Sequence, residues 1–207
     1  MGAAEALAEH AALLTRVEEL LPRVDEAARL IVAAYERDGV VLAFGNGGSA
    51  ADAQHLAGEL VGRFRRERRP LAAIALSSDP SVVTCIANDF TFDDVFARQV
   101  EAHGRAGDVA VGYTTSGRSE NVVRGLRTAR AAGLSTVLFA GDDGGPAAGD
   151  ADVALVVPST VTARVQEMHV LLMHLVVEQV DAWAAGAGLT EPAGSGGSAG
   201  AGAGSSQ

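Results

Sequence analysis

The chain of 207 residues carries 26 acidic and 16 basic side chains, and its net charge of −10 argues against broad nucleic-acid binding through a basic surface. A hydrophobic content of 48% with only 4% aromatic residues indicates one α/β domain with an Ala/Val/Leu core. The single cysteine, Cys85, cannot form an intrachain disulfide, and neither a signal-peptide pattern nor an apolar run of membrane-spanning length is found. We therefore expect a soluble, cytoplasmic protein with no nucleic-acid or membrane partner.

Helical periodicity dominates residues 1–37. Apolar side chains such as Leu13, Val17 and Leu20 recur at helical spacing, and Pro22 is expected to separate two helices. The first helix carries enough apolar residues that we expect it to pack on another subunit. Residues 1–37 are therefore predicted to be an oligomerisation segment that precedes the main domain.

Strands and helices alternate through the main domain, predicted over residues 38–185. The predicted strands cover 41–44, 71–76, 108–113, 136–139 and 153–156. The predicted helices cover 79–87, 92–103, 119–132 and 162–185. This alternation is typical of the α/β class with a doubly wound, five-stranded parallel sheet flanked by helices. The remaining segment, 186–207, consists almost wholly of Gly, Ala and Ser and is predicted to be a disordered tail.

The segment 41–59 joins the first strand to a glycine turn and a helix. Its turn contains Asn46, Gly47, Gly48 and Ser49. Backbone N–H groups at the start of a helix bind anions, and glycines let an anion approach the backbone closely. We therefore predict a phosphate or similar anion at this turn, with the Ser49 hydroxyl as a cap or a ligand.

The same turn also matches the dinucleotide-binding pattern G-x-G-x-x-G/A, with Ala50 at its last position. That pattern needs an acidic residue about twenty positions later, near the end of the second strand. Glu67 lies before that strand in a basic run, and Asp79 comes late. We therefore do not expect a nucleotide cofactor.

A second polar loop follows the third strand. It brings hydroxyl groups and one glycine to the start of a helix: Thr114, Thr115, Ser116, Gly117 and Ser119. Ordinary N-capping by Ser119 would explain this loop taken alone. Because ligands bind beyond the carboxyl ends of parallel strands, two such loops on one sheet favour a site for a phosphate monoester.

Titratable side chains follow the first loop and recur in the last helix. His55 and Glu59 are four residues apart and share a helix face, although Glu59 could instead pair with Arg63 and His55 could lie in the core. In the last helix, polar residues interrupt an apolar stripe: Gln166, His169 and His174. A histidine in such a stripe is more often a core residue than a catalyst. Gln166 and His174 lie about 80° apart around the helix and could face one site.

These residues and the basic run that follows them allow two further interpretations, a metal site and a contact with an anionic substrate. His55, Glu59, Gln166 and His174 could together hold a divalent metal, but their spacing is not that of a standard zinc motif. The basic run 63–69 is typical of a solvated helix end, and one of its arginines, Arg63 first among them, could reach an anionic substrate.

At these residues the chain resembles the SIS-domain (sugar isomerase) family, and within it the phosphoheptose isomerases. The resemblance extends over residues 45–180 and rests on four motifs: GNGGSAADAQHLAGELVGRF, AIANDFTFDDVFARQVEA, GDVAVGYTTSGRSENV and TARVQEMHVLLMHLVVE. It implies an aldose–ketose isomerase that converts sedoheptulose 7-phosphate to D-glycero-D-manno-heptose 7-phosphate, as a homotetramer. Two positions depart from the family pattern: Arg118 replaces a common Asn, and Ala163 replaces an Asp found in some members.

The resemblance also implies roles for particular residues. Those that would hold the phosphate are Ser49, Thr114, Thr115, Ser116 and Ser119. Those that would contact the sugar are Asn46, Arg63, Asp89 and Gln166. Glu59 and His174 would be the acid/base pair that forms an enediol, with Glu59 transferring the proton between C1 and C2. Some members bind one zinc ion per subunit through the positions of His55, Glu59, Gln166 and His174.

Two other functions are alternatives to the isomerase. A close branch of the family binds the bacterial replication initiator, but it lacks His at the position of His174 and has Arg at that of Ser116. Both residues are present here, which favours the enzyme. A sugar-phosphate sensor would need an added DNA-binding domain, for which no residues remain.

Overall fold

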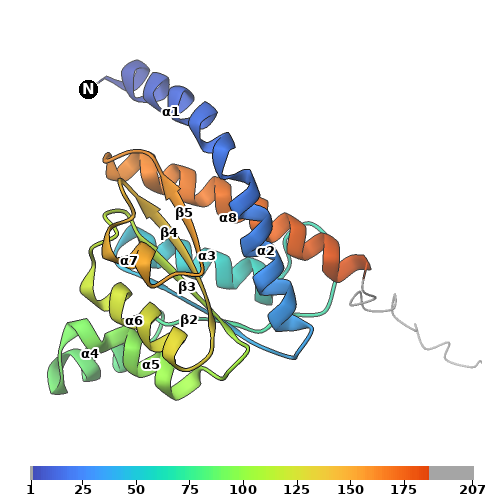
Figure 1. Ribbon diagram of the computed structural model, residues 1–207, viewed down its shortest axis with the longest axis vertical. Helices are drawn as coiled ribbons and strands as arrows, with labels where there is room; N and C mark the ends of the chain where they lie inside the picture. Colours follow the sequence, from blue (N-terminus) through green and yellow to red (C-terminus); the bar gives the residue numbers. More distant parts are fainter. Residues whose placement is uncertain (1, 187–207) are drawn as a thin grey trace, which may run out of the picture.

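The computed structural model describes residues 2–186, which form a three-layer α/β fold (Figure 1). Its sheet consists of β1 (Val41–Gly45), β2 (Ala73–Ala75), β3 (Val109–Thr114), β4 (Ser135–Gly141) and β5 (Val153–Val157). All pairings are parallel, and the strand order is β2-β1-β3-β4-β5. The predicted five-stranded, doubly wound sheet is thereby confirmed. The predicted disordered tail lies outside the described residues except for Gly186, so its disorder stays a prediction.

Helices cover both faces of this sheet (Figure 1). One face is covered by α2 (Leu21–Tyr35), α3 (Gly48–Val61) and α8 (Thr162–Gly186), and the other by α4 (Pro80–Asp89), α5 (Val95–His103), α6 (Glu120–Ala131) and α7 (Gly145–Gly149). Successive strand side chains point to opposite faces. Val41 and Ala43 therefore pack under the first group of helices, and Leu42 and Phe44 under the second. Because both faces are covered, β1 and β3 are buried along their whole length.

The N-terminal segment begins with α1 (Ala3–Val17), which projects beyond the sheet and its flanking helices (Figure 1). A short 3-10 turn, η1 (Glu18–Leu20), joins it to α2, whose first turn contains Pro22, so the predicted break between two helices is confirmed. On and just after α1, Leu7 is 69% exposed and Leu14 and Leu21 are also exposed. Packing of these residues on another subunit stays a prediction.

Local capping explains where α4 begins. The Asp79 carboxylate accepts hydrogen bonds from the backbone N–H groups of Ser81 and Val82, and Pro80 occupies the first turn of α4.

Two helices differ from the prediction. The helix predicted at 92–103 starts with a 3-10 turn, η2 (Phe92–Asp94), before α5. The short helix α7 had no counterpart in the sequence prediction. Among residues 2–186, no helix is long and apolar enough to cross a membrane.

The strand order determines where a ligand can bind. β1 and β3 are neighbours in the sheet, yet β1 leads into α3 on one face and β3 leads into α6 on the other. Open α/β sheets bind ligands at such a point, beyond the carboxyl ends of the two strands. The two loops predicted from the sequence to bind phosphate, 45–49 and 114–119, both lie there.

Candidate active site

The first loop is a tight turn that depends on glycine. Gly47 has a positive φ of 57°, and the backbone N–H groups of Ser49 and Ala50 donate to the carbonyls of Asn46 and Gly47. A Cβ added at Gly48 would lie 2.4 Å from Nε2 of Gln166. Gly48 therefore lets α8 approach the start of α3 and places the Gln166 amide beside the turn.

Hydrogen bonds within the second loop hold its shape, and the turn after β4 packs against it. The hydroxyls of Thr114 and Ser119 lie 3.1 Å apart, and the backbone N–H of Arg118 donates to Oγ of Ser116 at 3.2 Å. Gly117 has a φ of 67°, and a Cβ there would lie 2.1 Å from the carbonyl oxygen of Gly144. The turn after β4 therefore packs directly against this loop.

A pair of asparagine side chains, one in the first loop and one just after the second, joins the two loops. Nδ2 of Asn46 donates to Oδ1 of Asn121 at 2.8 Å, and Nδ2 of Asn121 donates to Oδ1 of Asn46 at 2.9 Å. Asn121 is 2% exposed and lies in the first turn of α6. We refer to loops 45–49 and 114–119, joined in this way, as the loop pair. Asn121 was not predicted from the sequence, where its only signal was a polar residue two positions after the N-cap residue Ser119.

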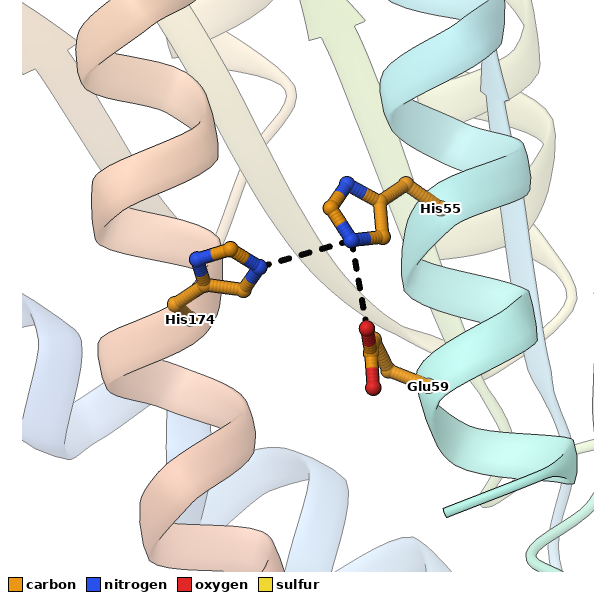
Figure 2. A group of neighbouring side chains, drawn as sticks. All are labelled: His55, Glu59 and His174. Atoms are coloured by element: carbon orange, nitrogen blue, oxygen red, sulfur yellow. Dashed lines mark hydrogen bonds and ion pairs between the residues drawn. The ribbon is translucent and has the colours of Figure 1, made fainter. Parts of the chain in front are cut away.

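The third feature is a group of side chains between α3 and α8, which we call the histidine cluster: His55, Glu59 and His174 (Figure 2). Nε2 of His55 lies 3.2 Å from Oε1 of Glu59 and 3.4 Å from Nε2 of His174. The two imidazole rings meet edge to face, with 5.0 Å between their centroids, and Phe64 stacks on His174. The side chains of His55 and Glu59 are 40% and 21% exposed, so a small molecule can reach them.

A buried carboxyl group lies one turn before His55. Asp52 is 8% exposed, and its Oδ2 has no hydrogen-bond partner. Burial raises the pKa of Asp52 to about 6, although the nearby His55 acts in the opposite direction. The same carboxyl group lies near the buried Tyr113, whose pKa is raised first by burial and then by the Asp52 charge. Sequence analysis did not single out Asp52.

The two histidines of the last helix have different environments. His169 is fully buried, and its Nε2 donates to the carbonyl of Ala140 at 3.1 Å. Burial lowers the pKa of His169 to about 4, so this residue is a neutral core histidine, as its place in an apolar stripe indicated. His174, only half-buried, faces the histidine cluster instead.

Three other predicted site residues belong neither to the loop pair nor to the histidine cluster. Gln166 contacts Gly48, and its role as a fourth metal ligand stays a prediction. Asp89 is exposed at the end of α4, where the Asn88 amide donates to its carboxylate. Arg63 is exposed beyond the end of α3, and its contact with substrate also stays a prediction.

The interpretation of the basic run as a solvated helix end is wrong. α3 ends at Val61, so residues 63–69 follow the helix rather than continue it. Glu59 consequently pairs with His55 rather than with Arg63. Arg68 is a fully buried side chain, which the sequence pattern did not suggest.

The SIS domain family model matches residues 7–141 of the chain. The phosphoheptose isomerase of Paramagnetospirillum magneticum is 52% identical over 183 residues, which cover 86% of this chain and 94% of that protein. This chain belongs to the SIS-domain phosphoheptose isomerase family. The resemblance inferred from the four sequence motifs is thereby confirmed.

Other members of the phosphoheptose isomerase family give the same result. The Aquifex aeolicus protein is 51% identical over 168 residues, which cover 81% of this chain and 88% of that one. The solved structure of phosphoheptose isomerase GmhA from Neisseria gonorrhoeae has a TM-score of 0.82 at 43% identity, and the match covers 86% of this chain and 96% of that one. These relatives support an isomerase and give no support to the non-catalytic binding protein considered from the sequence.

Proposed function

We propose that this protein isomerises sedoheptulose 7-phosphate to D-glycero-D-manno-heptose 7-phosphate through an enediol. The observation that carries the proposal is that α3 begins in the first loop of the loop pair and carries His55 and Glu59 of the histidine cluster further along. Ser49 lies in the first turn of α3, and His55 lies six residues later, which corresponds to about 9 Å of helix. That distance suits a seven-carbon sugar phosphate with its phosphate at the loop pair and its carbonyl end at the cluster.

The loop pair would bind the phosphate through neutral groups. Its residues Ser49, Thr114, Thr115, Ser116 and Ser119 provide hydroxyls, and the starts of α3 and α6 provide backbone N–H groups. Asn46, Gly47 and Gly48 would border the sugar phosphate at the first turn. Phosphate binding far from the reacting carbons supplies energy that orients the reacting end of the sugar.

The histidine cluster would carry out the proton transfers. Glu59 would remove the proton from one of C1 and C2 and return it to the other, which requires one base on one face of a cis-enediol. His174 would open the sugar ring or protonate the oxygen. Both groups belong to a set of ligand atoms that lie within 4.8 Å of one another, so one small group can contact both.

The histidine cluster would also fit a zinc ion. Zinc prefers imidazole nitrogen and carboxylate oxygen, and tetrahedral bonds of about 2.1 Å place neighbouring ligand atoms about 3.4 Å apart. The separations of 3.2 and 3.4 Å within the cluster match this spacing. His55, Glu59 and His174 would hold one zinc ion per subunit, with Gln166 as the predicted fourth ligand. When bound, zinc would polarise the sugar carbonyl as a Lewis acid.

Incubation of the purified protein with sedoheptulose 7-phosphate tests the proposal. We expect product analysis to show the aldose phosphate, and a parallel sample with a chelator to report the dependence on metal. Binding of the heptose phosphate without isomerisation, whichever metal is added, would overturn the proposed activity and support the binding-protein alternative.

We also propose that the enzyme is a cytoplasmic homotetramer assembled through residues 1–37. The exposed Leu7, Leu14 and Leu21 on and after α1 support this assembly. Deletion of residues 1–20 is expected to dissociate or precipitate the protein. A truncated protein of unchanged oligomeric size in light scattering would contradict the assembly, and cell fractionation tests the location.

A further inference from the structure

Arg68 is the one residue of the basic run whose side chain is fully buried among the described residues. Its Nε donates to Oδ1 of Asp181 at 3.1 Å, and Asp181 is itself 2% exposed. Its two terminal nitrogens donate to the backbone carbonyls of Glu59 at 2.8 Å and of Leu60 at 3.0 Å. One guanidinium group therefore joins the end of α3 to α8.

The carbonyls that Arg68 binds belong to the last turn of α3. Helix ends leave such carbonyls without intrahelical partners, and a buried end needs other donors. One of the two belongs to Glu59, which the proposed mechanism uses as the base. Arg68 therefore contacts the backbone of Glu59 directly. The Arg68 side chain itself is not part of the histidine cluster.

The second partner of Arg68, Asp181, lies on the same helix as His174 of the histidine cluster. It follows His174 by seven residues, so the two side chains lie on the same face of α8, two turns apart. α3 and α8 run side by side in the same direction, because Gly48 meets Gln166 and His55 meets His174. Arg68 thus bridges the two helices just beyond the histidine cluster that lies between them.

We propose that Arg68 is a positioning residue that holds Glu59 and His174 at their working separation. This inference rests on the proposed isomerase function. Proton transfer requires the acid and base to be placed within a fraction of an ångström, and a displacement of about 1 Å can cost a hundredfold in rate. The loop pair lies at the opposite end of α3, so substrate binding through the phosphate does not depend on Arg68.

A paired substitution separates positioning from stability. Replacing a buried ion pair by apolar side chains is often neutral for stability, whereas removing one partner leaves an unpaired buried charge. The double variant Arg68→Met/Asp181→Leu therefore removes the bridge without leaving Asp181 charged and alone. Arg65→Met is the matched control. Arg65 also pairs with an acidic residue of α8, Glu178, but this ion pair lies on the exposed surface.

We expect the double variant to fold but to melt below the wild type, because the Glu59 carbonyl loses the donor that Arg68 provides, while no unpaired charge is left buried. Its kcat is expected to fall by about tenfold to a hundredfold, the usual range for residues that orient a catalytic group, with little change in KM. Arg65→Met is expected to behave like the wild type. A crystal structure of the double variant supplies a second readout, in which the distance between the Glu59 carboxylate and the His174 imidazole is expected to change.

A wild-type kcat in the double variant, or an unchanged distance between Glu59 and His174, would overturn the proposal. If the double variant does not fold, Arg68→Lys provides the test, because lysine keeps the charge opposite Asp181 but lacks the planar fork that reaches both carbonyls. An unchanged kcat in that variant would also overturn it. If the wild-type protein does not isomerise the heptose phosphate, the proposed function fails, and the crystallographic separation still decides the role of Arg68.

Discussion

The loop pair and the histidine cluster both include part of α3 but are built in different ways. The loop pair consists of two short segments that each follow a strand, and its ligand groups are hydroxyls and backbone N–H groups. The histidine cluster consists of side chains from α3 and α8, which are more than 100 residues apart in the chain. Backbone turns shape the first region, whereas helix packing shapes the second.

This difference separates binding from chemistry. A substitution in the loop pair should act mainly on substrate affinity, because the phosphate takes no part in the reaction. A substitution in the histidine cluster should act mainly on turnover.

The largest effect is expected from the proposed acid and base. Glu59→Gln keeps the size of the side chain but removes the base, and His174→Asn removes the proton carrier. Each should lower kcat by about two to four decades, the span usual for a positioned acid or base, with little change in KM. Steady-state kinetics with sedoheptulose 7-phosphate measure both constants, and Glu178→Gln on the exposed side of α8 is the control. Near-normal turnover in Glu59→Gln would leave the mechanism without its base.

A smaller effect, on binding and stability, is expected from the second loop. Gly117→Ala would place a methyl group 2.1 Å from the Gly144 carbonyl at a positive φ, at a cost of about 2–5 kcal/mol from the backbone conformation and the overpacking together. We expect a lower melting temperature and a raised KM. Gly58→Ala is the matched control, since a Cβ there has nothing within 4 Å. Equal KM values for the two variants would contradict the role assigned to the loop.

The buried His169 should make stability depend on pH. Its pKa of about 4 in the folded chain lies below the ordinary value of 6.5, so between these values only the unfolded chain binds the proton. Its contribution is therefore complete above pH 6.5 and falls by about 3 kcal/mol as the pH drops to 4. Melting temperatures of the wild type and His169→Gln, compared at pH 7 and pH 5, should converge at the lower pH. Asp52, whose raised pKa acts in the opposite direction, is present in both proteins and cancels in the difference.

The smallest effect is expected from Arg118, where the family commonly has Asn. Its guanidinium forms two hydrogen bonds with the Asp143 carboxylate, but both side chains are more than half exposed. Exposed ion pairs contribute little to stability. We therefore expect Arg118→Asn to leave the melting temperature unchanged and to shift KM less than Gly117→Ala does. A larger KM shift in Arg118→Asn would mean that the arginine side chain itself contacts the substrate.

Local patterns in the sequence account for most of the fold. The five apolar runs, the turn residues and the capping signals at Asp79 and Pro80 each act over a few residues, and all five predicted strands are present. The glycine turn at 45–49 and the hydroxyl loop at 114–119 were recognisable for the same reason. The short helix α7 was missed because its glycine-rich sequence has no helical periodicity.

What depends on distant contacts could be found only in the tertiary structure. The sequence by itself determined the fold class, the two loops and the residue types available for proton transfer. The strand order, which makes β1 and β3 neighbours, was decided by packing across the sheet. The same packing pairs Asn46 with Asn121 and Arg68 with Asp181, residues 75 and 113 positions apart. No local pattern encodes such partners. A polar residue near a helix end can hydrogen-bond to water or to a buried group far away in the chain, and its neighbours in the sequence are the same in both cases.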